Sequence, residues 1–269
     1  MKTALRLIPL GLAAALVLSA CSSTSSQSVS SSTAGSSTTA GVPLVKAGKL
    51  TICTNPPFKP FEYTDDAGKV VGIDMDLVGE VAKDLGVALD VKVTSFDGIE
   101  SGIDLTAGNC DVAASGLSIT PARQAKMDFS TPYLDADQGL LVKQGSDIKD
   151  ASSLTGKRVG VQQGTTGEDW AKAQGLETVQ FEDLGLQVQA VQTGQIDAAL
   201  NDVATLNPYA KDGLAVAAKI PTGEKYGFGV KKGSSALLAA VNKTLDRVHS
   251  DGTYDAIYTA RVGTAPTAG

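Results

Sequence analysis

Apolar and polar positions divide the first part of the chain into short strands and one long helix. Apolar residues fill 50–54 and alternate over 89–93, which predicts two strands. Between them, 61–72 has the turn sequence DDAG at its centre and predicts a hairpin. A helix follows, which we expect Asp74 to cap and Gly86 to end. Its predicted inner face consists of Leu77, Val78, Val81, Ala82 and Leu85.

A helix over 97–107 and a strand over 111–115 come next, so strands and helices alternate as in a parallel α/β sheet. A weak internal repeat then links two parts of the chain. GNCDVAA at 108–114 is similar to GQIDAA at 194–199, each entering a predicted strand after a helix. The connection is common enough for the likeness to be chance, but we prefer to explain it by two α/β lobes.

Two lobes require the chain to cross between them, and two extended segments, 129–142 and 219–230, suit this role. The second crossing would return the chain to the first lobe and add a strand over 226–230. A long helix would then follow, with Leu238, Val241, Leu245 and Val248 on its inner face. Two crossings permit hinge closure about a ligand held at the carboxyl ends of the strands.

The sequence SGLSITPARQ at 115–124 lies where a strand ends and a helix begins. Thr120 is a good N-cap and Pro121 a good first helical residue. Backbone N–H groups at such a junction attract anions, and the guanidinium of Arg123 is able to grip a carboxylate bidentately. Taken alone, the stretch fits equally well a capped helix with a surface arginine.

The N-terminus predicts export. Lys2 and Arg6 precede an apolar run over 7–18 that is short for a bilayer span, so we expect 1–20 to be a signal peptide. Leu18-Ser19-Ala20-Cys21 resembles a bacterial lipobox, which would leave Cys21 as the lipid-bearing N-terminus; an ordinary signal peptide with a chance cysteine is the alternative. Residues 22–41 hold fourteen Ser or Thr and no charge, and we assign 21–47 to the lipidated cysteine and a flexible tether.

The net charge bears on the class of partner, and the cysteines bear on disulfide formation. Without residues 1–20 the chain has 21 Lys and Arg against 29 Asp and Glu, a formal charge of −8, so we expect no nucleic-acid partner. Cys53 and Cys110 would fold outside the cytoplasm, where disulfides persist. A bridge and two buried free thiols both remain open, because cysteines on neighbouring parallel strands can lie too far apart to bond. We expect no metal and no cofactor.

Five pieces of the chain form a specific pattern: NPPFKPF at 55–61, GIDMDL at 72–77, SGLSITPAR at 115–123, GVQQGTT at 160–166 and DGTY at 251–254. In this order they resemble the extracytoplasmic solute-binding proteins of polar amino-acid ABC transporters, family 3. The similarity spans nearly all of 48–262 and implies a type II periplasmic-binding fold. With it, we expect lobe 1 to comprise 48–136 and 223–269 and lobe 2 to comprise 137–222.

The resemblance implies roles for individual residues. Arg123 would hold the α-carboxylate of an amino acid, helped by backbone N–H groups of Ser118 and Thr166. Asp202 would pair with the α-ammonium, together with the carbonyl of Gly116 and the hydroxyl of Ser118. The other expected ligand-binding residues are Asn55, Phe58, Phe96, Ser115, Gln162 and Thr165.

Some of these residues bear on the ligand. Phe58 and Phe96 would sandwich the ligand side chain, unless they are ordinary core aromatics. Asn55 and Gln162 would read the end of that side chain, and because neither is charged we favour a neutral polar ligand such as glutamine or asparagine.

We therefore predict a monomeric lipoprotein on the outer face of the cell membrane or in the periplasm. It would bind an amino acid and deliver it to an ABC permease. One alternative is a sensing module for a membrane receptor. Another is a periplasmic enzyme like the prephenate or arogenate dehydratases that share this fold. The only histidine, His249, is expected to face solvent near a helix end, and no catalytic elbow or phosphate loop is present, so we expect no enzyme.

Overall fold

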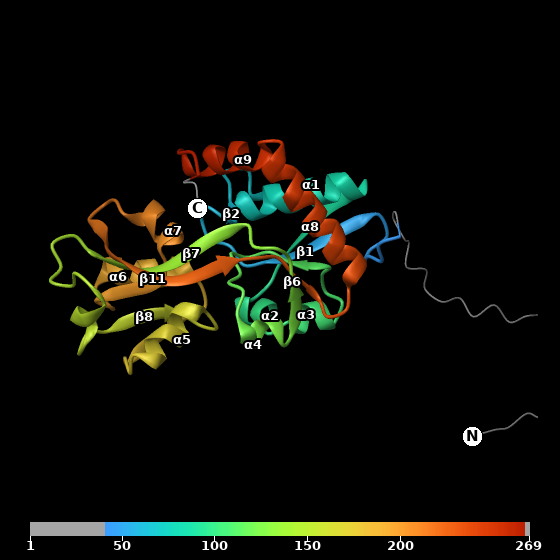
Figure 1. Ribbon diagram of the computed structural model, residues 1–269. Helices are drawn as coiled ribbons and strands as arrows, with labels where there is room; N and C mark the ends of the chain where they lie inside the picture. Colours follow the sequence, from blue (N-terminus) through green and yellow to red (C-terminus); the bar gives the residue numbers. More distant parts are fainter. Residues whose placement is uncertain (1–40, 267–269) are drawn as a thin grey trace, which may run out of the picture. The chain divides into compact units, whose positions relative to one another are not determined.

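The computed structural model describes residues 41–266, which contain two five-stranded sheets flanked by helices (Figure 1). The predicted signal peptide, Cys21 and most of the tether lie outside these residues. The first sheet has the order β4-β1-β5-β12-β6 and consists of β1 (Lys49–Thr54), β4 (Ala88–Val93), β5 (Val112–Ala113), β6 (Met127–Phe129) and β12 (Gly229–Lys231). The second has the order β11-β7-β10-β8-β9 and consists of β7 (Leu134–Lys143), β8 (Val159–Gln162), β9 (Thr178–Phe181), β10 (Ala198–Asp202) and β11 (Leu214–Tyr226).

The helices and a small hairpin complete the described part. The hairpin predicted over 61–72 is confirmed as β2 (Tyr63–Thr64) and β3 (Val70–Val71). The helices around the first sheet are α1 (Ile73–Leu85), α2 (Phe96–Glu100), α3 (Ile103–Thr106), α4 (Pro121–Gln124), α8 (Ser235–Ser250) and α9 (Thr253–Val262). Those around the second are η1 (Ala151–Leu154), α5 (Thr166–Ala173), α6 (Leu184–Thr193), α7 (Val203–Leu206) and η2 (Asn207–Tyr209). None of the helices in 41–266 is long and apolar enough to cross a bilayer.

The two sheets share one plan, so the internal repeat is confirmed as a structural one. β1 lies between parallel neighbours β4 and β5, as β8 lies between β9 and β10. The aspartate of each repeat also makes the same contact: the N–H of Thr51 donates to Asp111 Oδ2, and that of Arg158 to Asp197 Oδ2, both at 2.8 Å. Each carboxylate therefore links a central strand, near its start, to the neighbouring strand by a hydrogen bond.

The α/β prediction is confirmed, and the sheets are mixed, because an antiparallel strand joins each parallel set. β12 pairs with β5, and β7 pairs with β10. Both strands lie within or beside the predicted crossings, so they enter their sheets from an extended segment and without a crossover helix. The second crossing ends as two strands, since β11 stops at Tyr226 and β12 starts at Gly229.

β7 and β11 run side by side, antiparallel, from the pair Leu134–Tyr226 to the pair Lys143–Leu214 (Figure 1). Their pairing is irregular between Ile220 and Glu224. At the Tyr226 end the chain passes into the first sheet, because β12 starts at Gly229. The Tyr133 N–H donates to the Tyr226 carbonyl at 3.0 Å at this same end. The exact limits of the two lobes remain a prediction.

The predicted helix cap at Asp74 is wrong. The N-cap of α1 is Gly72, whose φ of 141° is a glycine conformation and where a Cβ would lie 2.0 Å from the Phe61 carbonyl oxygen. Asp74 lies inside the helix with its side chain fully buried, because its carboxylate accepts hydrogen bonds from distant parts of the chain. The five predicted inner-face residues of α1 are buried, and Gly86 ends the helix in the left-handed conformation.

Two further predicted elements differ from the structure. The helix expected over 97–107 is divided into α2 and α3, because Gly102 between them adopts a φ of 72° that interrupts a helix. The strand expected over 111–115 is only two residues long, since the chain leaves the sheet after Ala113 to form the loop that begins the SGLSITPARQ stretch.

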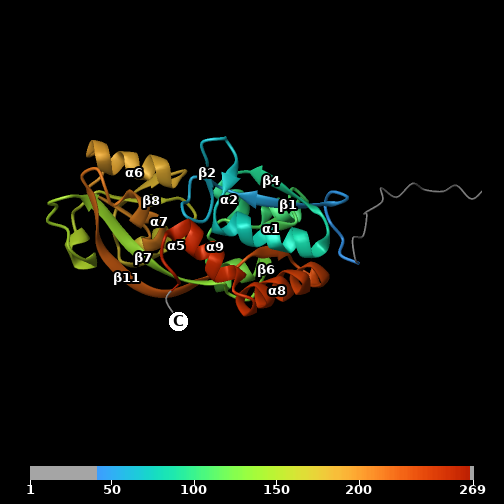
Figure 2. The ribbon, with the colours of Figure 1, turned by 90° about the horizontal axis from the view of Figure 1, so that it is seen from above.

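The C-terminal helices pack on α1, and the views in Figures 1 and 2 place α1, α8 and α9 next to one another. α8 buries Leu237 together with Val241, Leu245 and Val248, whereas Leu238 is only partly buried. His249 is exposed in the last turn of α8, as predicted, with its ring centroid 4.2 Å from that of Tyr254. Val42 and Leu44, within the segment assigned to the tether, are buried in the same core.

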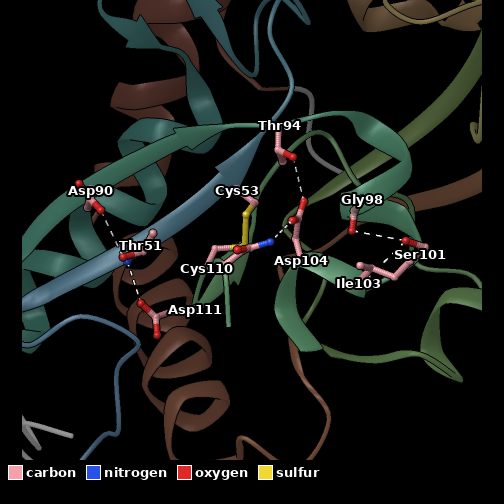
Figure 3. Close-up of a disulfide and its surroundings, with 11 residues drawn as sticks. Thr51, Cys53, Asp90, Thr94, Gly98, Ser101, Ile103, Asp104, Cys110 and Asp111 are labelled. Carbon is pink, nitrogen blue, oxygen red and sulfur yellow. Dashed lines mark hydrogen bonds between the residues drawn. A yellow bond between two sulfur atoms is a disulfide. The ribbon is translucent and has the colours of Figure 1, made fainter. Parts of the chain in front are cut away.

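Cys53 and Cys110 form a disulfide (Figure 3). Cys110 precedes β5 and is not part of its ladder with β1, so the two Cα atoms lie 5.7 Å apart, within disulfide reach. The concern about neighbouring parallel strands therefore does not apply. Closing a loop of 57 residues restricts the unfolded chain, which corresponds to about 4 kcal/mol of stability in the chain-entropy model.

Candidate ligand-binding cleft

One cavity gathers the residues that the sequence singles out for ligand binding. It lies where β1, β5, β8 and β10 end, so it is built from the carboxyl ends of strands in both sheets. The cavity is small, with a volume of about 10 Å³, because side chains from the two sheets meet there. Its lining residues are Asn55, Phe58, Phe96, Ser115, Gly116, Ser118, Arg123, Gln162, Thr165, Thr166 and Asp202. Every predicted ligand-binding residue is therefore on this cavity, and their individual roles remain predictions.

The SGLSITPARQ stretch presents Arg123 to the cavity. Thr120 caps α4 by accepting the Arg123 N–H at 3.2 Å, and Pro121 is the first helical residue, as predicted. The Arg123 side chain is not on the surface: the residue is 5% exposed, and its guanidinium carbon lies 5.5 Å from the centre of the Phe96 ring. The capped-helix alternative with a surface arginine is wrong.

The guanidinium of Arg123 reaches across to the second sheet. Its Nη1 donates to the Ser118 carbonyl at 3.0 Å, and its Nη2 donates to the Gly164 carbonyl at 2.9 Å. Its Nε lies 3.9 Å from Glu100 Oε2, too long for a hydrogen bond. A buried cation held mainly by carbonyl groups is incompletely neutralised, and such a group favours an anionic partner.

Asp202 is the buried anion on the opposite side of the cavity. It ends β10, is 6% exposed, and its Oδ1 accepts from Gln138 Nε2 at 2.6 Å. Burial raises the pKa of Asp202 to about 7, and the nearby Glu224 carboxylate adds to the increase while Arg123 opposes it. Near neutral pH the Asp202 carboxyl is therefore able to lose its proton when another cation binds beside it.

We call the SGLSITPARQ stretch the first jaw of the cavity and residues 164–166, at the start of α5, the second jaw. Thr165 caps α5: its hydroxyl accepts from the Glu168 N–H at 3.2 Å and donates to the Gln162 carbonyl at 2.7 Å. Gly164, with a φ of 75°, faces Phe96, and a Cβ there would lie 3.1 Å from an Asp97 carboxylate oxygen. This close approach explains a glycine at the point where the two jaws meet.

Asn55 and Gln162 meet at one end of the cavity. Gln162 Nε2 lies 3.3 Å from Asn55 Oδ1, while the Asn55 Nδ2 donates to the Thr94 carbonyl at 2.8 Å. Phe58, 6% exposed, borders Gly116, where a Cβ would lie 2.5 Å from the ring. Asn55 and Gln162 thus contribute uncharged amides to the cavity lining, and Phe58 contributes an aromatic ring.

Two polar residues of the site were missed from the sequence. Gln138 on β7 lies opposite Asp202 in the ladder and is 1% exposed. Glu224 on β11 accepts from Ser118 Oγ at 2.7 Å and from Thr166 Oγ1 at 2.6 Å, so one carboxylate oxygen joins both jaws. Both lie on segments identified only as crossings, and the pairing of β7 with β10 and β11 brings their side chains to residues that line the cavity.

The chain belongs to the bacterial extracellular solute-binding proteins, family 3, whose family model matches residues 50–263. It is 35% identical over 217 residues to the L-cystine-binding protein TcyJ of Escherichia coli K12, covering 78% of this chain and 81% of the relative. It is 32% identical over 255 residues to a probable histidine-binding protein of Neisseria gonorrhoeae, covering 91% and 90%.

Solved structures show the same architecture, the type II periplasmic-binding fold. An ancestral arginine-binding protein bound to arginine has a TM-score of 0.75 at 39% identity, covering 80% of this chain and 98% of that one. An ancestral arginine-binding protein bound to glutamine has a TM-score of 0.77 at 39% identity, covering 81% of this chain and 100% of that one. The ancestral amino acid-binding protein AncCDT-1, described as a precursor of cyclohexadienyl dehydratase, has a TM-score of 0.76 at 37% identity, covering 80% and 96%.

Proposed function

We propose that this protein binds a free amino acid in the cleft and delivers it to an ABC permease for import. The observation that carries the proposal is the placement of Arg123 and Asp202. They are buried opposite charges from different sheets, on one cavity. A zwitterion would meet a partner for each of its charges there, and closure of the two jaws would remove both ion pairs from water.

The relatives support the transport role. Their names describe binding of cystine and histidine, and one relative from Bacillus subtilis, 35% identical over 200 residues, is named an ABC transporter glutamine-binding protein. We propose in addition that Cys21 carries the lipid anchor, so that a monomer is tethered outside the cytoplasmic membrane beside its permease.

We propose glutamine or asparagine as the ligand class. The supporting feature is the pair Asn55 and Gln162, which offers amide groups and no charge to the end of a ligand side chain. A side-chain amide pairs well with such groups, whereas an ammonium or guanidinium would bring a charge without a facing carboxylate. Ancestral arginine-binding proteins have been solved with arginine and with glutamine, so a cationic ligand is the comparison to test.

A thermal-shift screen of the purified, ligand-free protein tests this function. Ligand at one hundred times its Kd stabilises the folded state by about 2.7 kcal/mol. For a body of this size we expect the Tm to rise by about 5 to 10 °C. Glutamine or asparagine is expected to give the largest shift among the twenty amino acids and ornithine. No shift with any of them would refute amino-acid binding, and a larger shift with arginine would refute the ligand class.

A further inference from the structure

Two buried carboxyl groups lie directly behind the loop that forms the floor of the cleft. Glu62 and Asp74 are both fully buried in the first sheet's core. Asp74 Oδ2 accepts from the Gly116 N–H at 2.9 Å, and its Oδ1 accepts from the Tyr133 hydroxyl at 2.6 Å. Among residues 41–266, the Glu62 side chain has a single partner, the Ser115 hydroxyl at 2.5 Å from Oε1, and its Oε2 has none.

The surroundings decide which of the two carboxyls holds a proton. In residues 41–266 neither forms a salt bridge with Lys, Arg or His. The titratable groups that face the pair are Tyr133, from the segment before β7, and Tyr226, from the end of β11. Burial raises the pKa of each phenol further, so both stay neutral. Glu62 and Asp74 therefore face each other without a neutralising cation.

Asp74 is the better placed of the two to remain ionised. Its two hydrogen-bond donors offset much of the effect of burial, and its pKa is about 6. Burial, together with the charge of Asp74, raises the pKa of Glu62 well above its usual range. A proton held by this pair therefore resides on Glu62, because Asp74 has two hydrogen-bond donors to support a negative charge and Glu62 has one such contact.

A carboxylic acid must place its O–H, and Glu62 has one acceptor within reach, the Ser115 oxygen. That oxygen also accepts the Asn55 N–H at 3.2 Å. A hydroxyl has two acceptor positions and one proton to donate. With both acceptor positions filled, the Ser115 proton is directed toward the cavity that Ser115 lines.

We propose that Glu62 is a positioning residue whose carboxylic O–H donates a hydrogen bond to the Ser115 oxygen and thereby leaves the Ser115 hydroxyl free to donate to the ligand. A donor at this point selects a ligand with an oxygen acceptor, such as a side-chain carbonyl, over one that carries only N–H groups. The inference rests on the proposed function and adds to it a reason for preferring glutamine to a basic amino acid. The basis is separate from the amides of Asn55 and Gln162.

Infrared spectroscopy of the purified full-length protein at pH 7 tests the protonation of Glu62 without any ligand. The difference spectrum between wild type and Glu62→Gln should contain the C=O band of a protonated carboxylic acid. Glu177→Gln, which replaces an exposed glutamate, is the matched control and should give only carboxylate bands. A difference spectrum for Glu62→Gln with carboxylate bands alone would overturn the proposal.

Calorimetric titration with glutamine and ornithine, which have side chains of similar length, tests the effect on the ligand. Glu62→Gln keeps a donor to Ser115 and should preserve the wild-type ratio of the two affinities. Glu62→Met and Ser115→Ala should each lower the preference for glutamine by about threefold to tenfold, the size of one neutral hydrogen bond. An unchanged ratio in both variants would overturn the proposal.

The two experiments separate this inference from the function on which it rests. Wild-type protein that binds neither glutamine nor ornithine would count against the proposed ligand, while the infrared spectrum would still decide whether Glu62 carries the proton. Wild-type binding with an unchanged ratio in Glu62→Met and Ser115→Ala would leave the function intact and refute the role of Glu62.

Discussion

Replacement of Arg123 by alanine is expected to weaken the binding of a free amino acid at least about a hundredfold. The guanidinium is buried, and carbonyl groups of Ser118 and Gly164 already hold it in position, so little of it moves on binding. Loss of one partner from a buried, hydrogen-bonded ion pair costs about 3 to 5 kcal/mol. Each 1.4 kcal/mol is a tenfold change in Kd.

Arg158→Ala provides the control for this variant. Arg158 is an exposed arginine just before β8 that pairs with Asp197. Neither residue lines the cavity. Its loss should leave ligand binding unchanged. Titration of both variants, with circular dichroism to establish that they fold, gives the comparison. Near-normal binding by folded Arg123→Ala would remove the arginine from the proposed clamp.

Binding is also expected to weaken as the pH falls below 7, and Asp202→Asn should abolish most of this dependence. The pKa of Asp202 is about 7, so at lower pH the carboxyl takes up a proton that the ligand ammonium must displace. Between pH 8 and pH 5 the wild-type Kd should rise by about a hundredfold, with a slope close to tenfold per pH unit only below the pKa of about 7. At pH 8 the variant should bind about a hundredfold more weakly than wild type.

The stability of the ligand-free protein should change in the opposite direction. A buried carboxyl whose pKa is raised contributes stability that is complete below its ordinary pKa of 3.8 and is lost as the pH rises from there through about 7. Asp202→Asn should therefore have a higher Tm than wild type at pH 8 although it has lost binding. Asp66→Asn, in the exposed hairpin turn, is the control and should alter neither property. A steep pH profile retained by Asp202→Asn would assign the proton to another group.

The features predicted well from the sequence are those with a strong local signal. The stripe of α1 and the capped start of α4 depend on residues within one or two helical turns, and both are confirmed. The repeat around Asp111 and Asp197 was visible as a short motif and corresponds to the same strand-to-strand contact in each sheet. The residues that line the cavity could be predicted from the motifs that resemble the family.

The features that were missed depend on contacts between distant segments. Asp74 looked like a helix cap because its partners, the Gly116 amide and the Tyr133 hydroxyl, lie 42 and 59 residues away. Gln138 and Glu224 belong to β7 and β11, whose faces are defined only once the strands are in register. Sequence periodicity on an extended segment gives alternation, but it does not say which face meets the cleft.

The most direct test of the central claim, a clamp for both charges of a free amino acid, is a calorimetric titration of the wild-type protein at pH 8. The ligands are the amino acid with the largest thermal shift, its methyl ester and its N-acetyl derivative. The free amino acid should bind, and each derivative, which lacks one of the two charges, should bind at least about a hundredfold more weakly. Binding of either derivative within about tenfold of the free amino acid would contradict the clamp.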